Sequence, residues 1–321
     1  MDSNDQNIIE TNSDATNSKY SCVVAGYYED AYLKYFVHSP TRRNPIINLG
    51  YAIRTSVIRN VVENFCLSYP GGQIVSIGAG SDTLAFWALG RFSDIKFIEL
   101  DHDSVLLSKL RCMKKNASAF STILDPNSFP DLHALAMSGR EFSWSSLDNR
   151  LSMIGLDLRS DPSMIIKRLE EGGYDYSRPT LVLSECVLIY LEMYVSNRVI
   201  RALGSMTRGA PVFLALYEQV NQADGFGKVM MENLHLRGCP LLSILPSTEA
   251  QSERLEALGF VDVRIERMTF FTNRIKTKRP EIIDEFEEFN LLQDHYFFAL
   301  ACSSPMSEGF LTSVFPDNLP Q

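Results

Sequence analysis

Two closely spaced glycines separate an apolar segment from a helical one. The sequence QIVSIGAGSDTLAFW, residues 73–87, is mostly apolar up to Gly78 and Gly80 and then resumes with helical periodicity. Glycine reaches positive φ without strain and lets a ligand lie against the backbone, because it has no Cβ. A dinucleotide-binding turn carries a third glycine three residues after the second, but Thr83 stands there. The missing third glycine disfavours a dinucleotide, and the two glycines alone fit either a ligand site or an ordinary tight turn.

Three carboxylates lie at the end of the next apolar segment, about twenty residues further on. Dinucleotide-binding folds also have an acidic residue at this position. The sequence FIELDHD contains Glu99, Asp101 and Asp103. A carboxylate at the end of this strand can accept both hydroxyls of a ribose. Asp101 is the candidate because it ends the apolar segment, whereas strand alternation directs Glu99 to the other face. An acidic turn that caps the following helix is the alternative.

Two further carboxylates stand in apolar surroundings. Asp157 lies between two leucines, and Glu185 interrupts TLVLSECVLIYL, which has no other formal charge. An isolated buried charge is costly, so each acid needs an internal cation or donors on a ligand. Asp157 could accept the amine of an adenine, and Glu185 suits a cationic amino group or sulfonium. If all these acids point to one edge of a sheet, they favour S-adenosylmethionine.

A basic residue falls on the apolar face of a predicted helix. The sequence GYAIRTSVIRNVVENF, residues 50–65, places its apolar side chains at helical spacing, with Arg54 on the same stripe and Arg59 opposite. A buried guanidinium must find an anion. That anion is either an internal carboxylate or a carboxylate of the ligand.

The elements that position these residues alternate between short apolar segments and helical patterns. This alternation predicts a doubly wound α/β fold with a mostly parallel, seven-stranded sheet. The last two strands are expected to pair antiparallel with each other. The expected strands are 73–77, 95–100, 152–158, 180–185, 211–217, 261–267 and 294–302. By composition, residues 1–18 are expected to form a disordered tail and residues 304–321 a C-terminal tail. Residues 19–303 then form a single domain, with 19–70 as a helical N-terminal lid.

Composition excludes several classes of protein. The net charge of −9 over 321 residues disfavours nucleic-acid binding, which needs clustered Lys and Arg. The six cysteines and five histidines show no metal-ligand spacing, so no metal site is expected and a reducing compartment fits best. The acidic first 18 residues do not resemble a signal peptide, and no apolar segment is long enough to span a membrane. We therefore expect a cytoplasmic protein without membrane contact.

Six motifs occur in a recognisable order: NPIINLGYAIR, IVSIGAGSDT, FIELD, GLDLR, LSECVLIYL and YEQVN. From about residue 19 to 301 the chain resembles the leucine carboxyl methyltransferase family. The best-known members of that family methylate the C-terminal leucine of the type 2A protein phosphatase catalytic subunit. The resemblance implies a class I methyltransferase fold, S-adenosylmethionine as donor and a protein substrate.

The resemblance also implies a role for each candidate residue in binding the donor. By motif position, the expected contacts are Lys19 and Arg54 with the methionine carboxylate region, Gly78 with the donor through its backbone, Asp101 with the ribose, Asp157 and Leu158 with the adenine, and Glu185 with the methionine end. No catalytic residue is singled out, since an α-carboxylate is already ionised at neutral pH. The YEQVN motif is expected to border the mouth of the substrate site or to lie in a loop.

Two other functions remain open from the sequence. One is a methyltransferase that acts on a carboxyl or hydroxyl group of a small molecule. The other is a donor-binding regulator of the phosphatase without turnover. We expect a monomer.

Overall fold

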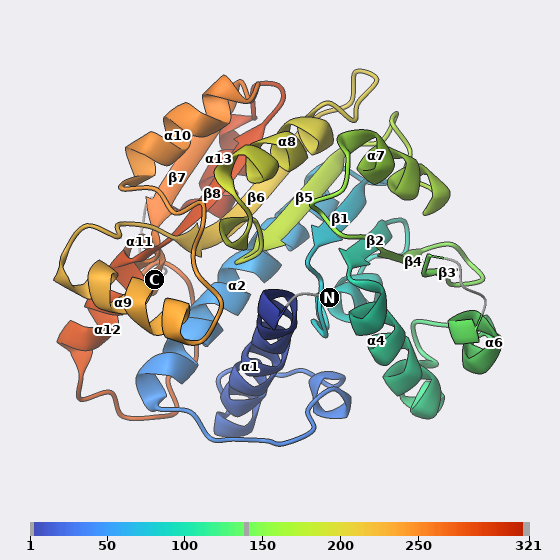
Figure 1. The fold of residues 1–321 in the computed structure, drawn as a ribbon, viewed down its shortest axis with the longest axis horizontal. Helices are drawn as coiled ribbons and strands as arrows, with labels where there is room; N and C mark the ends of the chain where they lie inside the picture. Colours follow the sequence, from blue (N-terminus) through green and yellow to red (C-terminus); the bar gives the residue numbers. More distant parts are fainter. Residues whose placement is uncertain (1–2, 138–140, 317–321) are drawn as a thin grey trace.

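The computed structural model describes residues 3–137 and 141–316. Its strands, in chain order, are β1 (Gln73–Ile77), β2 (Lys96–Asp101), β3 (Ser143–Ser145), β4 (Leu151–Gly155), β5 (Thr180–Glu185), β6 (Val212–Gln219), β7 (Asp262–Arg267) and β8 (Tyr296–Cys302). Over the described residues they form one eight-stranded sheet in the order β3-β4-β2-β1-β5-β6-β8-β7 (Figure 1). Strands β4, β2, β1, β5 and β6 are parallel, whereas β8 runs antiparallel to both of its neighbours.

The expected α/β fold and its mostly parallel sheet are confirmed, but the strand count is wrong by one. Strand β3 is an eighth strand that pairs antiparallel with β4 at the edge of the sheet. It has three residues, too few for an alternating pattern to be visible in the sequence. The buried ring of Trp144 holds it in place, and the indole N–H donates to the carbonyl oxygen of Ser128 at 2.8 Å.

Helices cover both faces of the sheet. In chain order they are α1 (Ser3–Ala25), η1 (Leu33–Tyr35), α2 (Pro45–Ser68), α3 (Leu84–Leu89), α4 (Asp103–Lys115), α5 (Ala117–Phe120), η2 (Pro126–Ser128), α6 (Leu132–Met137), α7 (Pro162–Glu171), η3 (Leu188–Tyr190), α8 (Met193–Gly204), α9 (Gly225–Leu236), α10 (Thr248–Ala257), α11 (Met268–Thr272), α12 (Phe286–Asp294) and α13 (Glu308–Val314). Helices α7, α8 and α10 pack on one face, along the upper side of Figure 1, and α2, α3 and α4 on the other.

Helix α2 carries the predicted apolar stripe. Its first turn is stabilised by Pro45 and by the side chain of Asn44, which accepts the N–H of Ile46 at 3.0 Å. The apolar residues of the stripe are buried in the core that α2 forms with the sheet. Arg54 lies on this buried stripe, as its spacing predicts, and is only 8% exposed.

Most of the expected N-terminal tail and part of the expected C-terminal tail are helical, which corrects the prediction from composition. Residues 3–18 belong to α1, where Thr16 and Ser18 are buried and their hydroxyls donate to carbonyl oxygens one turn earlier, at 2.7 and 2.8 Å. At the other end, α13 buries Phe310 and Val314 against α2. Residues 1–2 and 317–321 lie outside the described residues.

Four neighbouring strands bring their carboxyl ends to one edge of the sheet. The glycine turn follows β1, Asp101 ends β2, Asp157 follows β4 and Glu185 ends β5. Open α/β sheets hold their ligands at this edge. Among the described helices, none combines the length and apolar character required to cross a bilayer.

Candidate functional site

A cavity of about 1010 Å³ opens at the carboxyl edge of β4, β2, β1 and β5. The residues predicted to bind a donor all line it, namely Lys19, Arg54, Gly78, Asp101, Asp157, Leu158 and Glu185. They come from α1, α2 and the ends of four strands, so the fold brings together groups up to 166 positions apart in the chain. Their individual roles in binding stay predictions.

The glycine turn and Asp101 form one hydrogen-bonded unit. Gly78 and Gly80 have φ of 59° and 52°, as a sharp turn after β1 requires. One carboxylate oxygen of Asp101 accepts the N–H of Gly80 and the other accepts the N–H of His102, each at 2.7 Å. Burial raises the pKa of Asp101 above its ordinary value, although both N–H groups act to lower it.

Gly78 lies so close to Val187 that no side chain fits between them. A Cβ built on Gly78 would stand 2.4 Å from Cγ2 of Val187, which belongs to the segment after β5. The absence of a side chain at Gly78 therefore lets two neighbouring strand ends meet at the cavity wall.

Replacing Gly78 by alanine should cost about 3 kcal/mol of unfolding free energy, from left-handed backbone strain and overpacking together. Gly71→Ala is the matched control, because Gly71 also has positive φ, 74°, but no atom lies within 4 Å of its built Cβ. It should lose only about 1 kcal/mol. Urea unfolding of both variants measures the difference, and equal losses would show that Val187 moves aside freely.

Arg54 and Glu185 face each other in the cavity wall. Nε of Arg54 donates to Oε2 of Glu185 at 2.7 Å, and the guanidinium carbon lies 4.6 Å from the centre of the Tyr217 ring. Burial acts to lower the pKa of Arg54, but Glu185 together with Cys186, Tyr217 and Tyr51 outweighs it, and the pKa lies well above its ordinary value. Arg54 is therefore a permanent cation in this wall.

Lys19 connects this ion pair to the glycine turn. Its Nζ forms an ion pair with Asp82 and lies 3.5 Å from Oε2 of Glu185. Burial acts to lower the pKa of Lys19, but the two acids outweigh it and raise the pKa. Burial likewise acts to raise the pKa of Asp82, and Lys19 holds it below its ordinary value. Cations and anions thus alternate along one side of the cavity.

Asp157 is also paired within the chain. Its two carboxylate oxygens accept from Nε and Nη2 of Arg159, at 3.0 and 2.7 Å. Burial acts to raise the pKa of Asp157, but Arg159 outweighs it and lowers the pKa. Next to it, Leu158 presents an apolar side chain to the cavity. From the sequence, an internal ion pair and a position facing a ligand are alternatives for Asp157 and Glu185. In the structure each of these acids forms an internal ion pair and also lines the cavity.

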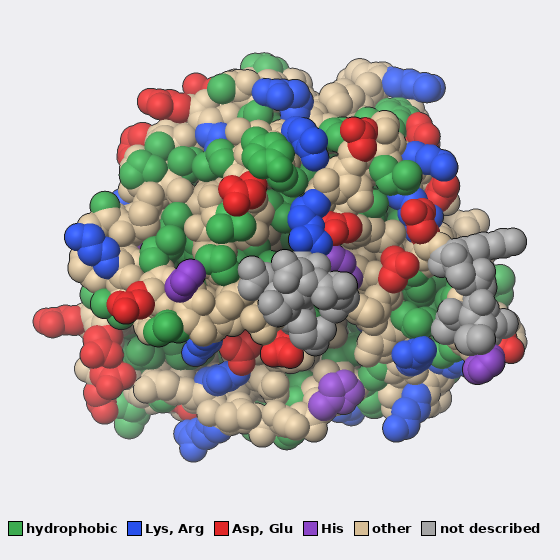
Figure 2. Space-filling view, viewed as in Figure 1, with side chains coloured by type: hydrophobic (Ala, Val, Ile, Leu, Met, Phe, Trp, Pro, Cys, Tyr) green, Lys and Arg blue, Asp and Glu red, His purple; other side chains and the backbone are tan. Residues whose placement is uncertain are grey.

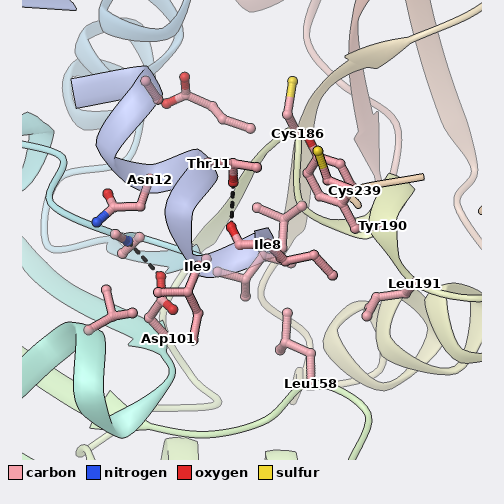
Figure 3. A pocket seen from close by; sticks show the side chains of 18 of the residues that line it. Ile8, Ile9, Thr11, Asn12, Asp101, Leu158, Cys186, Tyr190, Leu191 and Cys239 are labelled. Atoms are coloured by element: carbon pink, nitrogen blue, oxygen red, sulfur yellow. Dashed lines mark hydrogen bonds between the residues drawn. The ribbon is translucent and has the colours of Figure 1, made fainter. Parts of the chain in front are cut away.

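The N-terminal half of α1 lines the cavity, which the sequence did not predict. Figure 3 shows Ile8, Ile9 and Asn12 on α1 among the residues that line the cavity, with Ile9 beside Asp101. Oδ1 of Asn12 accepts the N–H of Ser81 at 2.8 Å, which ties this helix to the glycine turn. The two adjacent isoleucines, Ile8 and Ile9, stand in an otherwise polar segment and are the one sequence signal that could have indicated burial here.

Aromatic and polar residues complete the wall. Tyr51, Tyr190, Gln219 and Tyr296 line the cavity. The first three residues of YEQVN are not in a loop, because β6 extends to Gln219. Of this motif, Gln219 lines the cavity, and its Nε2 donates to the Tyr296 hydroxyl at 3.3 Å; that the motif borders the mouth of the substrate site stays a prediction.

Charged side chains are mixed over the face of the molecule in Figure 2. Lysines and arginines stand among aspartates and glutamates on the described part of that face and form no single basic patch. Surfaces that bind nucleic acid gather Lys and Arg, because they must neutralise phosphates. Among the described residues, no group of three or more His, Cys, Asp and Glu side chains could hold a metal ion.

The sequence is similar to a known protein family and to several known proteins. Residues 8–204 match the family described as leucine carboxyl methyltransferase. The leucine carboxyl methyltransferase 1 homolog of Arabidopsis thaliana is 35% identical, and the match covers 92% of this chain and 89% of that protein. The tRNA wybutosine-synthesizing protein 4 of Rattus norvegicus is 30% identical over 97% of this chain and 45% of that protein.

The fold comparison agrees with the class predicted from the sequence. A crystal structure of a putative methyltransferase from Thermobifida fusca has a TM-score of 0.50 at 16% identity, covering 79% of this chain and 81% of that chain. The structure thus has the class I methyltransferase fold that the sequence predicts. The family match spans more than half of the chain, and the Arabidopsis thaliana relative matches over most of its own length, so the protein is a methyltransferase. The chain belongs to the leucine carboxyl methyltransferase family.

Proposed function

We propose that this enzyme transfers a methyl group from S-adenosylmethionine to the C-terminal leucine carboxylate of the type 2A protein phosphatase catalytic subunit. The observation that carries the proposal is the convergence of Asp101, Asp157 and Glu185 on one cavity beside the glycine turn. Carboxylates in this arrangement suit a ligand that combines ribose hydroxyls, an adenine amine and a cationic centre.

The residues around the cavity fit this donor. Each oxygen of Asp101 accepts one backbone N–H, and a carboxylate can accept about four hydrogen bonds, so acceptor positions remain for two ribose hydroxyls. Leu158 offers an apolar surface for the adenine. Arg54 uses its Nε–H on Glu185 and has further N–H donors for the methionine carboxylate. Bound S-adenosylmethionine supplies an electrophilic methyl group on its sulfonium.

The acceptor carboxylate needs no general base, because an α-carboxyl has a pKa of roughly 3.3 to 3.7. The enzyme therefore has to align the reactants and exclude water, which would otherwise solvate the nucleophile. The positive charges of Lys19 and Arg54 in the wall attract a carboxylate. The rings of Tyr51 and Tyr190 occupy space in the same wall that water would fill.

The cysteines support a cytoplasmic location. All six lie among the described residues and are unpaired there. Unpaired thiols suit a reducing compartment. We place the enzyme in the cytoplasm, where it acts as a monomer on its protein substrate.

The test uses the full chain, labelled S-adenosylmethionine and the intact phosphatase catalytic subunit. We expect label that base releases from the phosphatase, as a methyl ester requires, and no label after the terminal leucine is deleted. Base-stable label elsewhere on the phosphatase would refute the proposal. Labelling of small carboxylic acids or alcohols alone would identify a small-molecule methyltransferase, and donor binding without transfer would identify a regulator.

A further inference from the structure

Glu218 is a buried acid outside the cavity wall. It lies in β6 and is 2% exposed. One carboxylate oxygen accepts the N–H of Ile189 at 2.8 Å, and the N–H groups of Val187 and Leu188 are also directed at the carboxylate. Glu218 therefore provides hydrogen-bond acceptors for backbone groups at the start of η3, where Val187 offers no capping side chain.

The segment that Glu218 contacts, residues 186–190, has an unusual backbone. Cys186 has φ of 55°, in the left-handed region that a residue with a side chain rarely adopts. Its N–H donates to the carbonyl oxygen of Tyr217 at 2.7 Å. On the far side, the N–H of Leu242 donates to the carbonyl oxygen of Ile189 at 2.8 Å. Such a conformation persists only where its surroundings determine it, and Glu218 is one of the charged groups among them.

Segment 186–190 joins three parts of the cavity. Glu185, the partner of Arg54, comes directly before it. Val187 lies against Gly78 at the glycine turn, and Tyr190 lines the cavity. A shift of this segment would therefore move an acid, an aromatic ring and the support of the turn together.

We propose that Glu218 is a positioning residue for methyl transfer, whose ionised carboxylate holds segment 186–190 in the conformation that completes the donor site. It acts through this segment and not on the reactants. The inference rests on the donor site proposed above. Protonation of Glu218 would remove acceptor capacity from backbone N–H groups, because a protonated oxygen becomes a donor.

Two groups face Glu218 from other elements and influence its charge. Arg254 on α10 stabilises the carboxylate, and the thiol of Cys186 lies close enough to interact with it. Burial raises the pKa of Glu218 to about 7, although Arg254 and the backbone N–H groups act to lower it. The donor site should consequently weaken as the pH falls below neutral.

The stability of the fold has the opposite pH dependence. A carboxyl whose pKa is raised on folding contributes stability at pH values below its unfolded pKa, and this contribution is lost as the pH rises through the folded pKa. Wild-type protein should therefore lose thermal stability between about pH 5 and about pH 8. Keeping Glu218 ionised beside segment 186–190 therefore lowers the free energy of unfolding.

The test is calorimetric binding of S-adenosylhomocysteine from about pH 6 to about pH 8.5, which needs no phosphatase. We expect Glu218→Gln to bind about tenfold more weakly than wild type at the upper end, as a lost charge-assisted hydrogen bond would give, and to show a flat pH profile. Arg254→Gln should shift the acidic limb of the profile to higher pH, since Arg254 lowers the pKa of Glu218. Glu253→Gln, an exposed neighbour on α10, should behave as wild type.

Melting temperatures at the same pH values identify variants that are merely unfolded. If Glu218→Gln does not fold, the positioning role is tested by Arg254→Gln, through the shift in the acidic limb of its binding profile. A wild-type profile in Glu218→Gln, or an unmoved limb in Arg254→Gln, would overturn the positioning role. Wild-type protein that binds no S-adenosylhomocysteine at any pH would instead overturn the donor site itself.

Discussion

Replacing Asp101 by asparagine should weaken binding of S-adenosylmethionine by about 100-fold. The amide retains the shape of the side chain but loses the charge, and hydrogen bonds to a charged group contribute about 1.5 to 3 kcal/mol each. The expected loss corresponds to two weakened bonds to ribose hydroxyls. The amide oxygen of the variant can still accept one of the two N–H groups that Asp101 accepts, so the fold should survive. Isothermal calorimetry with S-adenosylmethionine and S-adenosylhomocysteine measures the change.

Asp103→Asn is the matched control, two positions further along. Asp103 does not line the cavity, and its carboxylate accepts the N–H of Phe142 at 3.2 Å. This variant should bind the donor within a factor of about two of wild type. Equal loss in both variants would point to a general effect of local charge, and unchanged binding in Asp101→Asn would remove Asp101 from the site.

Replacing Glu185 alone by methionine should destabilise the protein more than replacing it together with Arg54. Glu185→Met leaves the guanidinium of Arg54, whose side chain is 10% exposed, without the carboxylate that it contacts. Removing one partner of a buried pair costs about 3 to 5 kcal/mol, whereas an apolar pair of similar volume is often neutral. The double variant Arg54→Met with Glu185→Met should recover most of the loss. Neither variant should bind the donor.

Guanidinium chloride unfolding of wild type, the two single variants Arg54→Met and Glu185→Met, and the double variant forms a double-mutant cycle. The cycle isolates the coupling free energy between Arg54 and Glu185. Arg178→Met is the control, because its partner Asp175 lies 3.4 Å away in an exposed pair. It should cost less than about 1 kcal/mol. Additive losses in the cycle would show that Arg54 and Glu185 are not coupled. Donor binding retained in the double variant would show that the pair is structural only.

The sequence was most informative where charge interrupts an apolar pattern. Strands β1 and β5 have the predicted bounds, because five or six apolar-rich residues end at a glycine turn or at Glu185. Arg54 is buried as its position on the stripe predicts. The glycines mark the end of β1, whereas Arg54 and Glu185 are charged side chains in apolar surroundings, which have few positions that satisfy them.

The elements that the sequence missed are held by contacts that leave no periodic signal. Helix α1 buries Thr16 and Ser18, whose hydroxyls are satisfied by its own backbone, so its composition resembles that of an unstructured tail. The contact between Asn12 and Ser81 joins residues 69 positions apart. The ion pairs of Asp157 and Glu185 were weighed as alternatives to ligand contacts, because spacing alone does not show whether a cavity lies beside an acid.

The position of β8 has a consequence for synthesis on the ribosome. Strand β7 pairs only with β8 in the described sheet, and β8 inserts between β6 and β7. At translation rates of about 5 to 20 residues per second, β7 would wait roughly 2 to 7 s for its partner to be made. During that interval β6 and β7 both expose unpaired backbone edges, which are templates for aggregation. Nascent chains stalled before residue 296 should accordingly depend on chaperones.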